Sequence, residues 1–286
     1  MNLLKSVFIS AFVTWLALLS LYAFMQLFRG TEPLLGWLGL AITAFAPLAF
    51  FLKAFLFKSP RTARHPVEYS VLSGLGLAIT MAISFRYGDT TGAIHVWAGI
   101  TLLGWFVYLR WYSVFQGRNS KALSVGSNLP VFELESLDGL VVSSESFMTK
   151  PHLLLFYRGN WCPFCTAQIE ELAAAYQQLE EMGITVVLIS PQPVEKNQRL
   201  ATRFNVAMTF LRDKDGTAAK QLGIHHKWGT PMGMQVLGYE SDSVLPTLLL
   251  TDAQGLIIFS DQTDNYRVRP EPKEFAALLR ERGVDI

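Results

Sequence analysis

The chain has few charged residues and only two cysteines, and each shortage excludes a class of protein. Charged residues make up 16% of its 286 residues, against roughly 25% in ordinary soluble proteins. The formal net charge is +1, and the basic residues form no stripe interleaved with aromatic ones, so no nucleic-acid partner is expected. Cys162 and Cys165 lie close together, whereas a secreted disulfide scaffold needs more cysteines at wider spacing.

The shortage of charge is concentrated in residues 1–118, where apolar runs alternate with short polar connections. The four runs are residues 6–28, 34–52, 69–85 and 93–109. The first two can cross a hydrocarbon core of about 30 Å at about 1.5 Å per residue. The other two lie near the lower limit of about 17 residues but contain no charge. The pattern predicts an α-helical membrane domain of four transmembrane helices anchored in a lipid bilayer, and the alternative is a buried helical bundle in a soluble protein.

Basic residues near the ends of the runs predict which side of the membrane each connection faces. Those on one side are Lys5, Lys53, Lys58, Arg61, Arg64, Arg110, Arg118 and Lys121, against only Arg29 and Arg86 on the other. Because cytoplasmic connections are enriched in Lys and Arg, we predict a protein of the bacterial inner membrane whose C-terminal domain faces the cytoplasm. His95 lies in the fourth run without a second histidine at that depth, so the helices are assigned the role of an anchor rather than a haem site.

From residue 119 onward the composition is that of a soluble protein. Residues 119–127 are polar and contain Ser and Gly, and they are predicted to form a linker. Residues 128–286 alternate short apolar runs with helix-period segments, which predicts an α/β domain. The expected strands are residues 131–134, 140–142, 153–157, 184–190, 208–211, 247–252 and 256–260. The expected helices are residues 163–182, 194–204 and 272–282.

The two cysteines lie where the predicted strand 153–157 passes into the predicted helix 163–182. Cys162 then occupies the helix N-terminus, where unpaired backbone N–H groups and the helix dipole stabilise a thiolate. The thiolate is the nucleophile of thiol–disulfide exchange, so Cys162 is expected to attack and Cys165, one turn further on, to resolve the mixed disulfide. Pro163 suits the first helical turn. Trp161 and Arg158 precede the pair, and Arg158 could add positive potential.

Three other uses of the cysteine pair fit the sequence less well. A zinc site needs two more ligands, and the adjacent His225 and His226 have no usual finger spacing. Covalent haem attachment needs a histidine directly after the second cysteine, where the chain has Thr166. A purely structural disulfide is not expected on the cytoplasmic side of a membrane. The pair is therefore predicted to be redox-active, with neither a metal nor a cofactor.

Residues 156–165 read Phe-Tyr-Arg-Gly-Asn-Trp-Cys-Pro-Phe-Cys, and this run resembles the signature of a peroxiredoxin-like (AhpC/TSA-type) branch of the thioredoxin-like superfamily. Residues 189–192 and the tail 264–270 fit the same branch, and the resemblance spans about residues 126–282. It implies a thioredoxin-like fold carrying the dithiol. It also implies that Pro246, which precedes a late strand, matches the cis-proline that holds a thioredoxin substrate beside the nucleophilic sulfur.

The same resemblance separates two mechanisms. Cys165 matches the peroxide-attacking cysteine of peroxiredoxins, and Cys162 replaces a threonine that helps to bind peroxide. Residues 244–246 are Val-Leu-Pro, where peroxiredoxins are expected to carry an arginine. The resemblance therefore favours a membrane-anchored thiol–disulfide oxidoreductase that acts on a protein or small-molecule disulfide and is re-reduced by a cellular thiol donor. The alternatives are an antioxidant peroxidase acting on peroxides near the bilayer and a non-catalytic membrane scaffold with a thioredoxin-like binding domain.

Residues 223–243 form a segment longer than a minimal thioredoxin domain requires, and it contains Trp228 together with Gly- and Met-containing sequence. Two interpretations are open. The segment is either a substrate-recognition flap beside Pro246 or a loop that packs on the membrane face.

Overall fold

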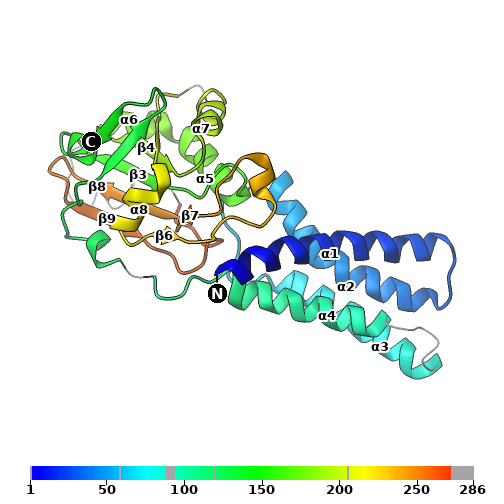
Figure 1. Cartoon of the computed structure of the whole chain (residues 1–286). Helices are drawn as coiled ribbons and strands as arrows, with labels where there is room; N and C mark the ends of the chain where they lie inside the picture. The colour runs from blue at the N-terminus through cyan, green and yellow to red at the C-terminus, as the bar shows by residue number, and fades with distance from the viewer. Residues whose placement is uncertain (1, 58, 88–93, 119, 205, 272–286) are drawn as a thin grey trace. The chain divides into compact units, whose positions relative to one another are not determined.

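The computed structural model describes residues 2–57, 59–87, 94–118, 120–204 and 206–271. These residues form two compact units, which are described separately (Figure 1). The helical unit comprises Val7–Lys58 and Thr62–Val114. The α/β unit comprises Phe115–Ile286 together with Met1–Ser6 and Ser59–Arg61. The division after Val114 lies close to the predicted boundary at residue 118.

The helical unit is built from long apolar helices. They are α1 (Asn2–Phe28), α2 (Leu34–Leu56), α3 (Val67–Tyr87) and α4 (Ile94–Val107), and α4 continues as the π-helical turn η2 (Tyr108–Tyr112). Within the described residues three stretches, Asn2–Phe28, Leu34–Leu56 and Val67–Arg86, are long and apolar enough to cross a membrane. The fourth predicted span, residues 93–109, begins outside the described residues, so four spans remain a prediction.

Small residues let α2 and α3 approach each other closely. A Cβ atom added at Gly39 would lie 2.7 Å from the carbonyl oxygen of Gly76. The Ser73 hydroxyl donates to the carbonyl oxygen of Thr43 across the same contact, at 2.9 Å. Close backbone approach at small residues, reinforced by a hydroxyl hydrogen bond, is a typical way of packing helices that have no charged faces.

The α/β unit contains a seven-stranded mixed sheet (Figure 1). Its order is β2 (Val141–Ser143), β1 (Glu133–Ser136), β5 (Thr209–Arg212), β4 (Thr185–Ser190), β3 (His152–Phe156), β8 (Thr247–Thr251) and β9 (Ile257–Asp261). Strands β3, β4 and β5 run parallel, and β8 pairs antiparallel with β3. Every residue of β3 and β8 is buried. The unit is a thioredoxin-like α/β domain, and the predicted leading hairpin is confirmed as β1–β2.

In the described part of the α/β unit, four short α-helices accompany this sheet. They are α5 (Pro163–Ala174), α6 (Tyr176–Glu181), α7 (Val194–Ala201) and α8 (Thr217–Gln221). The single helix predicted over residues 163–182 is interrupted at Ala175, whose φ of −91° and ψ of 1° end one helix and begin the next. The predicted helix 194–204 ends earlier, at Ala201. The predicted closing helix, residues 272–282, lies outside the described residues.

The sequence does not predict the second, two-stranded sheet of this unit. Strand β6 (His225–His226) pairs antiparallel with β7 (Ser243–Val244), and the 3₁₀ turn η6 (Met234–Leu237) lies between them. Strands of two residues are too short to produce a readable period, and the two pairing partners are separated by the segment that the sequence marks only as an insertion. The sheet closes the base of that insertion.

The segment predicted to be a linker belongs instead to the α/β unit. Residues 121–123 form the 3₁₀ turn η3 (Lys121–Leu123), and the Leu123 side chain is fully buried in the core. The Gly126 N–H donates to the carbonyl oxygen of Ile257 at 2.8 Å, and Asn128 forms a β-bridge with Leu256. The prediction was wrong because one apolar side chain fixes this otherwise polar segment to the domain.

We expect Leu123→Ala to destabilise the α/β unit by about 2–5 kcal/mol, because the substitution leaves a cavity in a packed core. The measurement is urea denaturation of the purified chain in detergent. The matched control is Leu140→Ala, which removes an exposed leucine and is expected to cost less than about 0.5 kcal/mol. Equal effects of the two substitutions would show that residues 120–127 do not contribute to the core.

Candidate functional site

The junction between β3 and α5 has a backbone that only glycine accommodates at one position. Gly159 has a φ of +144°, a region that side chains rarely adopt. A Cβ atom there would lie 2.7 Å from Nε1 of Trp161 and 3.2 Å from Oε1 of Gln192. The chain then reaches Cys162 in extended geometry as the N-cap of α5, and Pro163 begins the helix as predicted. Glycine therefore lets the Trp161 ring fold back beside the dithiol.

Both cysteines are reduced and buried, with Cys162 1% exposed and Cys165 fully covered. The Cys162 side chain accepts no capping hydrogen bond. Instead, the N–H groups of Cys165 and Thr166 donate to the carbonyl oxygen of Cys162, at 3.0 and 3.1 Å. Cys162 therefore caps α5 through its backbone carbonyl oxygen, and no capping hydrogen bond reaches its sulfur.

A buried arginine stands beside Cys165. Nη2 of Arg269 lies 3.5 Å from Sγ of Cys165. The guanidinium is held in place because Nη1 donates to Oε1 of Gln168 at 2.5 Å and Nε donates to the carbonyl oxygen of Tyr266 at 3.0 Å. Arg269 was not among the predicted site residues. The signal that could have identified it is the tail 264–270, which carries two arginines within a family-like run.

The two thiols have opposite tendencies to ionise. For Cys162, burial, the hydrogen bond to Cys165 and the adjacent Cys165 charge all raise the pKa. Burial also opposes ionisation of Cys165, but the hydrogen bond from Cys162, the charge of Arg269 and the Arg158 backbone together lower the pKa of its thiol. An opposite charge at this range favours the charged form of a buried group. These pKa directions and the Arg269 contact favour a thiolate on Cys165, whereas the sequence analysis assigns it to Cys162.

The charge of Arg158 acts to lower the pKa of both thiols, and its guanidinium stacks on two aromatic rings. The guanidinium carbon lies 4.6 Å from the centroid of the Trp161 ring and 5.4 Å from that of Tyr266. Nη2 of Arg158 donates to the carbonyl oxygen of Gly229 at 2.5 Å. The Tyr266 ring also meets the Phe164 ring edge-on, at a centroid distance of 5.5 Å. Stacked cation–π and aromatic contacts of this kind hold Arg158 and the surrounding rings together.

A buried network of polar side chains, which the sequence does not reveal, connects the β3–α5 junction to α7 and to the loop that precedes it. The Tyr157 hydroxyl donates to Oδ1 of Asn197 at 2.6 Å, and Nε2 of Gln192 donates to the same oxygen at 2.6 Å. Oε1 of Gln192 accepts from the Asn160 N–H at 2.9 Å. Burial raises the pKa of Tyr157, so its hydroxyl stays protonated and able to donate. A connected network of buried polar groups holds a site rigidly.

Pro246 does not match the thioredoxin cis-proline in conformation. Within the described residues only the Glu32–Pro33 peptide bond is cis, so Pro246 follows a trans bond and that prediction was wrong. The approach to Pro246 is already extended, because β7 pairs with β6 and the Leu245 N–H donates to the carbonyl oxygen of Ile224 at 2.8 Å. The Pro246 carbonyl oxygen accepts from Nη2 of Arg118, which also donates to Oγ1 of Thr247.

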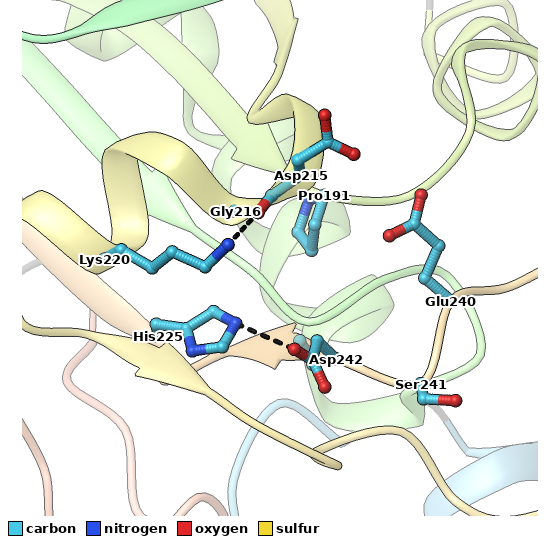
Figure 2. Close-up of a pocket in the computed structure, with 9 residues that line it drawn as sticks. Pro191, Asp215, Gly216, Lys220, His225, Glu240, Ser241 and Asp242 are labelled. Carbon is cyan, nitrogen blue, oxygen red and sulfur yellow. Dashed lines mark hydrogen bonds and ion pairs between the residues drawn. The ribbon is translucent and has the colours of Figure 1, made fainter.

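The side chains of His225 and His226 have different surroundings. His225 and Asp242 both line a pocket of about 350 Å³. Nε2 of His225 lies 3.1 Å from Oδ2 of Asp242 (Figure 2). The His226 ring packs edge-on against Phe115 at 5.4 Å, and burial lowers the pKa of His226 to about 3. Among the described residues no group of three or more His, Cys, Asp or Glu side chains is placed to hold a metal ion.

Comparison with known proteins gives matches over the α/β unit. The model of the AhpC/TSA family matches residues 125–260. Peroxiredoxin Bcp of Escherichia coli is 31% identical over 147 residues, which cover 50% of this chain and 90% of that protein. A putative peroxiredoxin bcp of Coxiella burnetii is 27% identical over 136 residues, which cover 48% of this chain and 86% of that protein. The crystal structure of peroxidoxin BcpB from Mycobacterium tuberculosis aligns with a TM-score of 0.46 at 22% identity, over 56% of this chain and 97% of that one.

We expect Arg269→Met to raise the pKa of Cys165 by about 1 to 3, because it removes the positive charge nearest the sulfur. The measurement is the rate of alkylation by iodoacetamide as a function of pH. Arg203→Met is the matched control, since Arg203 is exposed and pairs with Glu170. An unchanged pH profile in Arg269→Met would mean that the charge of Arg269 does not stabilise the thiolate.

We expect Tyr266→Ala to expose the dithiol, because the Tyr266 ring packs against both Phe164 and Arg158. Loss of about 1.4 kcal/mol of packing corresponds to roughly tenfold faster alkylation of the reduced protein. The matched control is Tyr176→Ala, which removes a tyrosine bonded to Glu180. If both variants are alkylated at the wild-type rate, Tyr266 does not control access to the cysteines.

Proposed function

Since the chain belongs to the AhpC/TSA family, we propose that its α/β unit is a peroxidase that reduces peroxides at Cys165. The observation that carries the proposal is the contact of 3.5 Å between Nη2 of Arg269 and Sγ of Cys165. A thiolate is the reactive form of cysteine, and this contact favours the thiolate on Cys165. The match to peroxiredoxins agrees with that assignment, because Cys165 is the residue that resembles their peroxide-attacking cysteine.

The proposed reaction begins with attack of the Cys165 thiolate on the outer oxygen of a hydroperoxide. The new S–O bond forms as the O–O bond breaks, the alcohol leaves with a proton from solvent, and Cys165 becomes a sulfenic acid. The Cys162 thiol then attacks the sulfenic sulfur, which releases water and forms the disulfide between Cys162 and Cys165. Two thiol equivalents from a cellular donor restore the dithiol by thiol–disulfide exchange.

Peroxiredoxins are expected to carry an arginine and a threonine at positions where this chain has other residues. Arg269 and Cys162 are the candidates to take their places. The arginine expected before the late strand is replaced at Cys165 by Arg269, which comes from the tail instead. Cys162, which stands where peroxiredoxins have a threonine, lies at the N-cap of α5, and its thiol helps to lower the pKa of Cys165. Both features support peroxide chemistry over the disulfide exchange initiated by Cys162 that the sequence favours. The exchange step remains in the cycle as the route of re-reduction.

The helical unit supports a location for this reaction. Three of its helices are long and apolar enough to cross a bilayer, so the peroxidase would be anchored to a membrane. The distribution of basic residues along the sequence favours the bacterial inner membrane, with the α/β unit on the cytoplasmic side. That compartment holds reduced thiol donors and keeps exposed dithiols reduced.

The test is rapid mixing of the reduced full chain with hydrogen peroxide, and separately with a small disulfide, followed by counting of free thiols. We expect oxidation by peroxide at least about a hundredfold faster than for a free thiol, because the site stabilises the developing charge. Cys165→Ser should abolish it. Cys162→Ser is the matched variant, and it should still consume peroxide once and accumulate a sulfenic acid that dimedone traps.

A different pair of results would replace the proposal. Peroxide oxidation no faster than for a free thiol, with rapid disulfide exchange that vanishes in Cys162→Ser, would assign thioredoxin-type exchange. If the wild-type chain carries out neither reaction, the remaining hypothesis is the non-catalytic membrane scaffold.

A further inference from the structure

The segment between β6 and β7 is attached to the catalytic loop near both of its ends. The Gly229 carbonyl oxygen accepts from Nη2 of Arg158 at 2.5 Å. On the return path, the Tyr239 hydroxyl donates to Oδ1 of Asn160, and the Ser243 hydroxyl donates to the carbonyl oxygen of Arg158 at 3.2 Å. The position of this segment is therefore coupled to the residue that covers Trp161 and the dithiol.

The middle of the segment exposes apolar side chains in place of the polar ones usual for a loop. Val236 is 89% exposed, Leu237 57% and Met232 49%. Gly233 and Gly238 flank η6, which contains Val236 and Leu237, and their φ values of +97° and +84° turn the chain at both ends of it. We name residues 228–238 the apolar loop. A contiguous set of exposed apolar side chains marks an interaction surface rather than an ordinary loop.

Trp228 begins the apolar loop in a strained conformation. Its φ is +56°, a region that a bulky residue rarely occupies. The Trp228 N–H donates to Oδ1 of Asp242 at 2.8 Å, and the pairing of β6 with β7 holds the preceding residues. The indole is 39% exposed, next to the exposed Lys227. An exposed tryptophan beside a lysine is the combination that lies at the boundary between water and lipid headgroups.

The apolar loop is also hydrogen-bonded to the start of the first apolar run of the sequence. The Ser6 hydroxyl donates to the carbonyl oxygen of Thr230 at 2.6 Å. The Met232 N–H donates to the carbonyl oxygen of Ser6 at 3.2 Å. Ser6 is the residue at which the first predicted span begins, so the loop is fastened to the point where the chain is expected to enter the bilayer.

We propose that the apolar loop inserts into the surface of a phospholipid bilayer and presents the site to hydroperoxides of membrane lipids. The inference rests on the proposed peroxidase function and names its substrate class. The Cys165 thiolate attacks the outer oxygen of the lipid hydroperoxide, the lipid alcohol leaves, and the sulfenic acid is resolved by Cys162 with release of water. Because Gly229 in the loop accepts a hydrogen bond from Arg158, insertion of the loop would also affect the position of the Arg158 side chain beside Trp161.

The test compares two peroxide substrates for the full chain reconstituted in phosphatidylcholine vesicles. One is a phosphatidylcholine hydroperoxide within the bilayer, and the other is hydrogen peroxide in the buffer. The variant Val236→Asp/Leu237→Asp places charge on the loop, and we expect it to reduce lipid hydroperoxide turnover by at least about tenfold, because burying a charge at the interface is unfavourable. Turnover of hydrogen peroxide should stay within about twofold of the wild type, since neither side chain belongs to the site.

The matched control is Leu140→Asp, which places a charge on an exposed leucine of the β1–β2 turn. It should leave both rates unchanged. Equal loss of the two rates in the loop variant, or no loss of either, would overturn the docking role. A wild-type chain that reduces neither peroxide would contradict the proposed function itself.

A second measurement does not depend on activity. Val236→Cys in a chain that also carries Cys162→Ser and Cys165→Ser is labelled with an environment-sensitive fluorophore, and Leu140→Cys in the same background is the control. Quenching of the Val236 label, but not of the Leu140 label, by spin-labelled phospholipid is the expected result. Equal quenching of the two labels would overturn the proposal. Self-quenching between copies without quenching by lipid would overturn it as well, and would assign the surface to a second copy of the chain.

Discussion

The chemistry of the α/β unit depends on one buried charge pair, the Cys165 sulfur and the Arg269 guanidinium. A buried charge is costly unless it is paired and hydrogen-bonded, so each partner requires the other. Gln168 on α5 and the Tyr266 carbonyl orient the arginine, which fastens the chain after β9 onto the helix that carries Cys165. The fold around the dithiol is thus closed by the same contact on which the proposed reactivity of the sulfur rests.

Cover over the site follows from the same arrangement. The run that supplies Arg269 also supplies Tyr266, and this ring packs with Phe164 and Arg158 over the cysteines. A low-dielectric surrounding strengthens the attraction between thiolate and guanidinium, whereas contact with water would weaken it. Reactivity and burial are therefore coupled, because the side chains that exclude water also preserve the charge distribution that makes Cys165 a nucleophile.

The sequence predicts those features of the fold and site that depend on residues close together in the chain. The strand–Cys162–Pro163 junction, the leading hairpin and the long apolar helices follow from short-range patterns, and the structure contains them. The choice of Cys165 as the thiolate did not follow, because the deciding residue, Arg269, is distant in the chain and its direction depends on tertiary packing. The isomer of Pro246 and the burial of Leu123 were missed for a related reason. Their surroundings are built by β-pairing and core contacts that no local pattern encodes.

The position of Cys162 at the N-cap of α5 has a consequence for the lifetime of the protein under oxidative load. Where a resolving thiol lies in a distant segment, a sulfenic acid persists until the chain rearranges, and more oxidant can carry it to the irreversible sulfinic state. Here the second cysteine is the N-cap of the helix that carries Cys165, so the disulfide can close without a large rearrangement. Such a site is suited to repeated turnover at high oxidant concentration, and it gives up the sensitivity to overoxidation that would let it act as a redox signal.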